Sequence, residues 1–365
     1  MDLRWLEERY KGSRCRHGGK KEKDKGDYLD FSANVNPFAP NPTMLRMVRS
    51  MVADKEFYVS YPDSSYQRAC GSISDYLGNV GKDNVILTNG TIELIKLFCE
   101  VFTKGCAVIP TPTFCEYERF SRINGADMVF IDRDIRFETD ILNAMEGGTC
   151  ENVGTAFICN PNNPTGSLIK RDILVELVES LERKNALLFI DEAFIDFAPG
   201  ETMVTEAIEH ENVVVGRSLT KILGIPGIRL GYGVACEKLI SYLKDAQMPW
   251  SVNNLARGIA ENISEFDDFI KKSVSILEGE RSYVVQGLSR IRGIDILPSH
   301  SNFVMLRIDG LSSQEIADDM RRGGILVRRC NSFRGGDENS IRIAIRDREE
   351  NDQLLKVMIG LYGNR

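Results

Sequence analysis

Groups of reactive and turn-forming residues recur along this 365-residue chain, each shortly after a short apolar run. The most conspicuous is Ser218-Leu219-Thr220-Lys221, which follows VVVGR and precedes the glycine-rich segment GIRLGYG, where Arg229 lies. The other apolar runs are followed by Asn89-Gly90-Thr91, Phe114 in PTPTF, Asn163 in NPNNPTG and Asp191 in DEAF. Such runs are typical of buried strands, and open parallel sheets bind ligands at the carboxyl ends of their strands.

Together, these residue types match what pyridoxal 5′-phosphate (PLP) requires of a protein. A lysine forms a Schiff base with PLP and later moves protons at the substrate α-carbon, which suits Lys221. A carboxylate such as Asp191 keeps the pyridine nitrogen protonated, so that the ring can act as an electron sink. An aromatic side chain can stack on the pyridine and an amide can bond to its 3′-oxygen; Phe114 and Asn163 are the candidates.

The phosphate of PLP calls for N–H groups at a helix N-terminus, hydroxyl groups and an arginine. The candidates are Gly90, Thr91, Ser218 and Arg229. Each signal alone also has an ordinary structural interpretation, since NNPTG is a good turn and Ser218-x-x-Lys221 is a plausible helix start. Their common order, each at a predicted strand end, favours one PLP site over a set of unrelated turns.

These residues resemble those of the fold-type I PLP enzymes, in the branch that contains histidinol-phosphate aminotransferase and threonine-phosphate decarboxylase. The resemblance runs from about residue 17 to the C-terminus. It implies an α/β fold in which a large domain has a mostly parallel seven-stranded sheet and a smaller domain is α+β. It also implies a homodimer in which Tyr61, in YPD, reaches the cofactor phosphate of the neighbouring subunit. Arg342, in IRIAIRD, resembles the arginine that binds the substrate carboxylate.

Four features favour the decarboxylase within this branch. His17-Gly18-Gly19 followed by LDFSANVNP resembles its N-terminal signature, which makes His17 and Asn34 substrate-binding candidates. TFCEYERF resembles its F-S-E-Y-E-R segment, and Phe194 stands where the aminotransferase usually has a tyrosine. ILVRRCNSF resembles its L-I-R-x-C run, so Arg328 is the candidate for the substrate phosphate. His17 and Arg328 also have a plainer interpretation as solvated surface side chains.

The implied reaction is PLP-dependent decarboxylation of O-phospho-L-threonine to (R)-1-amino-2-propanol O-2-phosphate in cobalamin biosynthesis. Histidinol-phosphate aminotransferase remains an alternative, because it shares the cofactor site and also takes an amino-phosphate substrate. A third alternative is a PLP-binding regulator, which would carry a basic DNA-binding segment. The chain has 46 Lys and Arg against 53 Asp and Glu, so we expect no nucleic-acid partner.

The elements that must position these residues follow from the apolar pattern. From about residue 85, short β-rich runs alternate with helix-like segments, and residues 91–102 have an apolar face of helical spacing. This alternation predicts a largely parallel sheet covered on both faces. We expect a large PLP-binding domain over residues 43–254. We expect the second domain to consist of residues 1–42 and 255–365. Residues 1–42 would form an N-terminal arm that lies across the cleft or on the small domain.

The composition is that of an ordinary globular protein, with 42% hydrophobic and 27% charged residues and a net charge of −7. Nine scattered cysteines without a C-x-x-C pair, and three widely spaced histidines, predict reduced thiols and no metal site. The start of the chain lacks the apolar stretch of a signal peptide, and no run approaches the roughly 18 residues of a membrane helix. We therefore expect a cytoplasmic enzyme with no membrane partner.

Overall fold

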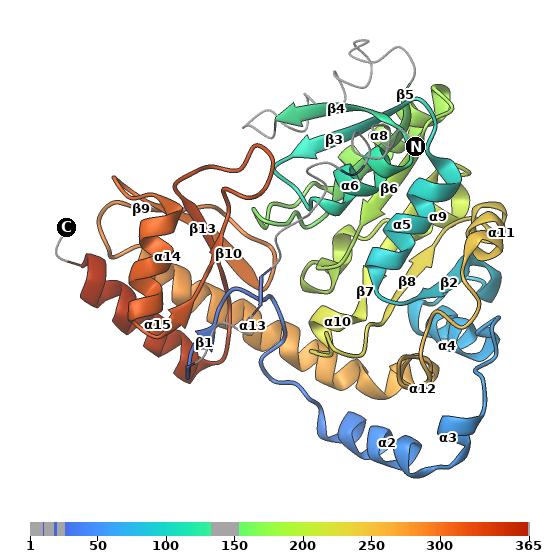
Figure 1. Cartoon of the computed structure of the whole chain (residues 1–365), viewed down its shortest axis with the longest axis horizontal. Helices are drawn as coiled ribbons and strands as arrows, with labels where there is room; N and C mark the ends of the chain where they lie inside the picture. Colours follow the sequence, from blue (N-terminus) through green and yellow to red (C-terminus); the bar gives the residue numbers. More distant parts are fainter. Residues whose placement is uncertain (1–9, 11–17, 20–25, 133–152, 364–365) are drawn as a thin grey trace, which may run out of the picture.

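A seven-stranded sheet forms the centre of the computed structural model, which describes residues 10, 18–19, 26–132 and 153–363 (Figure 1). The strand order is β2-β8-β7-β6-β5-β3-β4. The strands are β2 (Val85–Thr88), β3 (Cys106–Thr111), β4 (Asp127–Asp132), β5 (Val153–Cys159), β6 (Leu187–Asp191), β7 (Val213–Ser218) and β8 (Gly231–Val234). Only β8 runs antiparallel to its neighbours in this sheet. The prediction of a mostly parallel seven-stranded sheet is confirmed.

Helices cover both faces of this sheet. Consecutive side chains of a strand point to opposite faces, so a strand that is buried on both sides must be apolar throughout. In β5 and β6, Phe157 and Phe189 face one layer, whereas Ala156 and Leu188 face the other. The first layer contains α5 (Thr91–Phe102), α6 (Glu116–Ile123) and α11 (Glu237–Ala246). The second contains α4 (Gln67–Leu77), α8 (Arg171–Arg183), α9 (Val204–Glu209) and α12 (Asn254–Glu261).

A smaller antiparallel sheet lies beside the large one and appears in orange and red in Figure 1. Its order is β12-β13-β10-β9. These strands are β9 (Ile294–Ile296), β10 (Phe303–Ile308), β12 (Arg328–Arg329) and β13 (Ser340–Ala344). The helices that share its apolar core are α13 (Asp267–Leu288), α14 (Ser313–Arg322) and α15 (Arg348–Tyr362). None of the described helices has the length and apolar character of a membrane span.

The N-terminal segment, residues 26–41, joins the two sheets. Its strand β1 (Leu29–Asp30) pairs in parallel with β11 (Ile325–Leu326), on the side of the small sheet. Its other end is bound to α10 (Leu219–Ile222), because the backbone N–H of Asn36 donates to the Lys221 carbonyl at 3.1 Å. The chain then continues into α2 (Pro42–Ala53) and α3 (Glu56–Val59). The segment therefore holds the lysine-bearing helix and the small sheet in a fixed relation.

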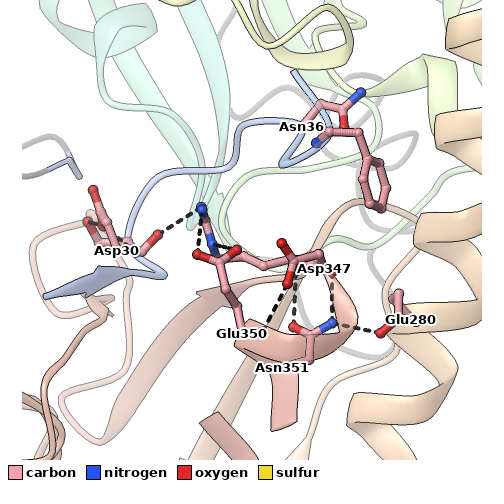
Figure 2. Close-up of polar contacts among 9 residues, drawn as sticks. Asp30, Asn36, Glu280, Asp347, Glu350 and Asn351 are labelled. Carbon is pink, nitrogen blue, oxygen red and sulfur yellow. Dashed lines mark hydrogen bonds and ion pairs between the residues drawn. The ribbon is translucent and has the colours of Figure 1, made fainter. Parts of the chain in front are cut away.

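A partly buried polar network fixes this segment to the start of α15 (Figure 2). Arg346 binds Glu350 through two hydrogen bonds, at 2.7 and 2.9 Å, and donates to the Asp30 carbonyl at 3.3 Å. The Asn351 side-chain amide donates to Glu280 on α13 at 2.9 Å and to the Arg346 carbonyl at 2.8 Å, and its oxygen accepts the Arg346 N–H. One fully buried asparagine thus ties α13, α15 and the N-terminal segment together.

Asn351→Leu should lower the free energy of unfolding by about 2 kcal/mol or more, because it removes the side-chain partner of the Arg346 N–H and carbonyl and one hydrogen bond of the buried Glu280. Chemical denaturation monitored by circular dichroism would measure the change. Tyr283→Phe is the control: it removes an exposed hydrogen bond to Asp352, and should leave stability nearly unchanged. Equal effects of the two substitutions would contradict the importance of this network.

Candidate active site

A cavity of about 390 Å³ lies where the large sheet, the small sheet and the N-terminal segment meet. Its lining includes eleven of the residues that the sequence predicted for the site. These are Asn34, Gly90, Thr91, Phe114, Asn163, Asp191, Ser218, Lys221, Arg229, Arg328 and Arg342. Two further candidates are not in the lining, because Tyr61 lies on the surface, 80% exposed, and His17 falls outside the described residues. Residues far apart in sequence therefore converge on one cavity.

Lys221 lies on α10, directly after β7, and its side chain lines the cavity. Burial, together with the positive charges of Arg342 and Arg229, lowers the pKa of Lys221 to about 8. The Asp191 carboxylate opposes this shift. The neutral amine is therefore accessible near neutral pH, which is the form that attacks a carbonyl carbon.

Asp191 lies at the carboxyl end of β6, and both of its carboxylate oxygens accept hydrogen bonds. The Tyr117 hydroxyl donates to Oδ2 at 2.6 Å, and the Ala193 N–H donates to Oδ1 at 3.0 Å. Burial raises the pKa of Asp191 to about 6, while Tyr117, Ala193 and the charge of Lys221 act in the opposite direction. A cationic ring nitrogen beside this carboxylate would favour its ionised form further.

Glycine allows close backbone packing at the start of α5. Gly90 has φ 71°, and a Cβ there would lie 2.7 Å from Arg229 Nη2. A Cβ on Gly231 would lie 2.5 Å from the Thr91 nitrogen. This helix N-terminus, together with the nearby Ser218 hydroxyl and Arg229 guanidinium, has the donors that bind a phosphate.

Arg342 approaches the cavity from β13 and is held by groups from both sheets and the N-terminal segment. Its Nη1 donates to Asn163 Oδ1, its Nη2 donates to the Ser32 carbonyl at 2.9 Å, and its guanidinium lies 5.1 Å from the Phe303 ring centre. Its buried Nε has no hydrogen-bond partner among the described residues. Burial, together with the nearby charge of Arg328, lowers the pKa of Arg342 to about 10. An anionic ligand would offset this cost of burial.

Arg328 lies opposite Arg342 in the register of β12 and β13, so both side chains belong to the same face of the sheet. Its guanidinium lies 4.7 Å from the Phe333 ring centre, and its Nη1 donates to the Arg329 carbonyl at 2.6 Å. Asn34, also in the lining, has a buried Oδ1 without a hydrogen-bond partner among the described residues. These groups give the cavity a second polar end for a bound ligand.

Residues 26–358 match the family model "Aminotransferase class I and II". The chain belongs to this aminotransferase family. It is 31% identical over 350 residues to a "Putative threonine-phosphate decarboxylase" of Caldanaerobacter subterraneus subsp. tengcongensis, covering 95% of this chain and 94% of the relative. It is 30% identical over 338 residues to the histidinol-phosphate aminotransferase of Methanothermobacter thermautotrophicus, covering 91% and 88%.

Solved structures of the aminotransferase family have the same fold. The histidinol-phosphate aminotransferase from Clostridium acetobutylicum is similar with a TM-score of 0.84 at 30% identity, over 92% of this chain and 100% of the other. The L-threonine-O-3-phosphate decarboxylase from Porphyromonas gingivalis gives 0.78 at 23% identity, over 91% and 99%. The histidinol-phosphate aminotransferase from Sinorhizobium meliloti, solved with pyridoxal-5′-phosphate, gives 0.80 at 21% identity, over 91% of each chain. The prediction of a fold-type I PLP enzyme is confirmed.

The cofactor of this aminotransferase-family protein is PLP, and the cavity fits it. Lys221 offers an amine of lowered pKa, and Asp191 offers a carboxylate that needs a cationic partner. Gly90 and Gly231 leave the space that a side chain would occupy at the start of α5. The unpartnered Nε of Arg342 has the polarity expected beside an anionic substrate.

Tyr117 is the main site residue to which the sequence assigned no role. It is fully buried; its ring stacks on Phe157 at 5.3 Å and meets the Phe114 ring edge-on at 5.7 Å. It thereby supports both the proposed stacking residue and the carboxylate of Asp191. A usable signal was the spacing of three between Phe114 and Tyr117, which places neighbouring side chains together at a helix start.

The prediction that the cysteines are reduced is wrong for one of the described cysteines. Cys115 is disulfide-bonded, whereas the other described cysteines, Cys70, Cys99, Cys106, Cys159, Cys236 and Cys330, are free. A disulfide requires two Cα atoms within about 7 Å, a proximity that depends on tertiary structure and is not visible in sequence spacing. Cys330 is fully buried, which raises the pKa of its thiol to about 12, so it is not a nucleophile near neutral pH.

Tyr117→Phe should raise the pKa of Asp191 above the value of about 6, because the lost hydrogen bond stabilises the ionised form. The carboxylate is ionised above its pKa, so PLP affinity should fall as the pH drops through that pKa. The fall should therefore begin at a higher pH in Tyr117→Phe than in the wild type. The measurement is the PLP dissociation constant between about pH 5 and 8, followed by cofactor absorbance.

Tyr362→Phe is the matched control, because this buried tyrosine also donates to an aspartate, Asp319, at 3.1 Å. It should leave the pH dependence of PLP binding unchanged. An identical pH dependence in Tyr117→Phe and the wild type would show that Tyr117 does not control Asp191.

Proposed function

We propose that this protein decarboxylates O-phospho-L-threonine to (R)-1-amino-2-propanol O-2-phosphate, a step of cobalamin biosynthesis. The observation that carries the proposal is the pair Arg328 and Arg342, in register on adjacent strands and both in the cavity lining. Two guanidinium groups suit a small substrate with two anionic groups, a phosphate and a carboxylate. The relative named as a threonine-phosphate decarboxylase supports this reaction.

In the proposed cofactor site, PLP when bound acts as the electron sink that lets a bond at the substrate α-carbon break. Lys221 binds the cofactor and later moves a proton at the α-carbon, while Asp191 keeps the ring nitrogen protonated. Phe114 would cover the ring and Asn163 would donate to its 3′-oxygen. Gly90, Thr91, Ser218 and Arg229 would hold the phosphate.

The substrate anchors select the reaction. For decarboxylation, the anchors would have to present the bond to the α-carboxylate, rather than the bond to the α-hydrogen, to bound PLP. Arg342 takes this carboxylate, and its orientation is set by Asn163 and the Ser32 carbonyl. Arg328 takes the phosphate at the other end, with His17 and Asn34 as further contacts. Binding energy from the remote phosphate is thereby used to orient the reacting bond.

Phe194 supports decarboxylation over amino transfer. Its ring is buried, lines the cavity and packs edge-on against Phe303 at 5.0 Å, beneath Arg342. It has no hydroxyl to hydrogen-bond the cofactor oxygen. Histidinol-phosphate aminotransferase remains the second candidate, because relatives of that name match at 30% identity and this site suits any amino-phosphate.

The assembly we propose is a cytoplasmic homodimer whose subunits each have a large domain, residues 43–254, and a second domain from 1–42 and 255–365. Tyr61 supports the dimer, because a tyrosine that is 80% exposed and packs at 4.7 Å on the exposed Trp250 forms part of an uncovered aromatic surface. In the dimer, Tyr61 binds the cofactor phosphate of the neighbouring subunit.

The purified PLP-loaded protein should release carbon dioxide from O-phospho-L-threonine. A parallel sample with L-histidinol phosphate and 2-oxoglutarate should form no glutamate. Lys221→Ala should abolish both the cofactor absorbance band and the activity, since no other amine replaces the nucleophile. Glutamate without carbon dioxide would assign the aminotransferase reaction instead, and an active Lys221→Ala protein would contradict the whole site.

Subunit mixing tests the dimer and the role of Tyr61. Neither Lys221→Ala nor Tyr61→Ala should be fully active alone, but their hybrid contains one site with a native Lys221 and a native Tyr61 from the neighbour. After refolding an equal mixture, activity should reach about a quarter of the wild type, because half of randomly assorted dimers are hybrids. A mixture no more active than the average of its components would place Tyr61 in its own subunit's site or in none.

A further inference from the structure

One arginine of the segment 331–336, between β12 and β13, binds side chains at one edge of the large sheet. Arg334 Nε and Nη2 donate to the two carboxylate oxygens of Glu118 on α6, both at 2.7 Å. The same guanidinium lies 4.3 Å from the ring centre of Phe130 on β4. Glu118 also accepts a hydrogen bond from Arg122, one turn further along α6, at 2.7 Å. The paired forks of arginine and carboxylate fix both distance and orientation.

Two glycines fix the same segment against its surroundings. Gly335 has φ 65°, which favours glycine, and a Cβ there would lie 3.0 Å from the Thr111 hydroxyl at the end of β3. A Cβ on Gly336 would lie 2.2 Å from the Cys330 carbonyl. The segment is therefore packed between the end of a large-sheet strand and its own preceding residues.

Phe333 connects this contact to the cavity. It precedes Arg334, is buried, lines the cavity and lies under the guanidinium of Arg328, 4.7 Å from its ring centre. A displacement of Arg334 would move Phe333 and, with it, the surface on which Arg328 rests. The contact between Glu118 and Arg334 lies outside the cavity, but it influences the positions of Phe333 and Arg328 in the cavity lining.

We propose that the Glu118–Arg334 ion pair positions Phe333, and through it Arg328, for the phosphate of a phosphorylated amine substrate. The inference rests on the proposed substrate class and adds two positioning residues outside the cavity lining. The side chains of Glu118 and Arg334 are 19% and 49% exposed, so the pair contributes little to global stability. Its defined bidentate geometry is instead what positioning requires.

The location of Glu118 explains why this pair bears on catalysis. Glu118 follows Tyr117, which binds the Asp191 carboxylate. One helix, α6, therefore holds the carboxylate for the cofactor nitrogen and the segment beneath Arg328. The sequence EYER, which resembles a decarboxylase signature, therefore contributes one residue that contacts Asp191 and another that contacts Arg334.

Kinetics of Glu118→Gln, Arg334→Gln and the double variant test the proposal. Each single variant should lower kcat/KM for O-phospho-L-threonine about ten-fold, because a displaced Arg328 weakens the phosphate contact that also orients the reacting bond. The double variant should be no worse than either single one, because both changes break the same contact. Arg122→Gln is the matched control: it removes the ion pair of Glu118 that stays within α6, and should leave kcat/KM unchanged.

Ligand binding gives a readout that does not depend on turnover. Stopped-flow cofactor absorbance would give dissociation constants of the PLP-loaded variants for O-phospho-L-threonine and for L-threonine. Arg334→Gln should weaken only the phosphorylated ligand, again about ten-fold, and the PLP dissociation constant should stay unchanged. Equal weakening of both ligands, or no change for either, would overturn the proposal.

The same measurement with L-histidinol phosphate and L-histidinol separates this inference from the choice of reaction. If the protein transfers amino groups instead of releasing carbon dioxide, the Arg334→Gln effect should appear on that phosphorylated substrate. An effect on neither phosphorylated ligand would refute the positioning role, whichever reaction the enzyme performs.

Discussion

The structure depends on keeping opposite charges buried around one cavity. A buried charge without a partner is costly, and the pKa values reflect this cost: Asp191 is raised to about 6, Lys221 lowered to about 8 and Arg342 lowered to about 10. Neutral donors and acceptors, such as the Tyr117 hydroxyl and the Ser32 carbonyl, orient these groups without neutralising them. PLP and the anionic substrate that we propose would bring the missing counter-charges, so that ligand binding would offset the free-energy cost of burying these groups.

The charged groups around the cavity come from two sheets, whose relative position must be fixed by a connection. The large sheet supplies Asp191 and Lys221, whereas the small sheet supplies Arg328 and Arg342. The N-terminal segment fixes their relation, because Asn36 at one end binds α10. At the other end the Asp30 carbonyl accepts from Arg346, just before α15 (Figure 2). The Ser32 carbonyl of the segment also accepts from Arg342, so the tether is part of the site itself. A change that destabilises the N-terminal segment should therefore also change the position of Arg342.

The sequence predicted the cofactor side of this cavity because strand periodicity is local and the carboxyl ends of parallel strands meet at one edge. Asp191 and Lys221 could thus be brought together from apolar runs alone, and α5 has the bounds expected for it, Thr91–Phe102. Contacts between units were not accessible in this way. Arg334 and Glu118 are 216 residues apart, and no periodicity relates them. The two-residue strand β1 and the disulfide of Cys115 likewise depend on tertiary proximity.

Cofactor-binding residues alone do not distinguish decarboxylation from amino transfer. Both reactions use a lysine, a ring-nitrogen carboxylate and a phosphate site, and they differ only in which bond at the α-carbon stands perpendicular to the ring. That rotation is set by groups far from the reacting carbon. The groups that we propose for this role are Arg342 above Phe303 and Arg328 above Phe333, and the Phe303 ring is packed in turn by Phe194. An aromatic ring beneath a guanidinium group fixes the plane of that group, and thereby the orientation of an anion bound to it. Because both arginines lie on the small sheet, we expect the preferred reaction to depend on how firmly the small sheet is held against the large one.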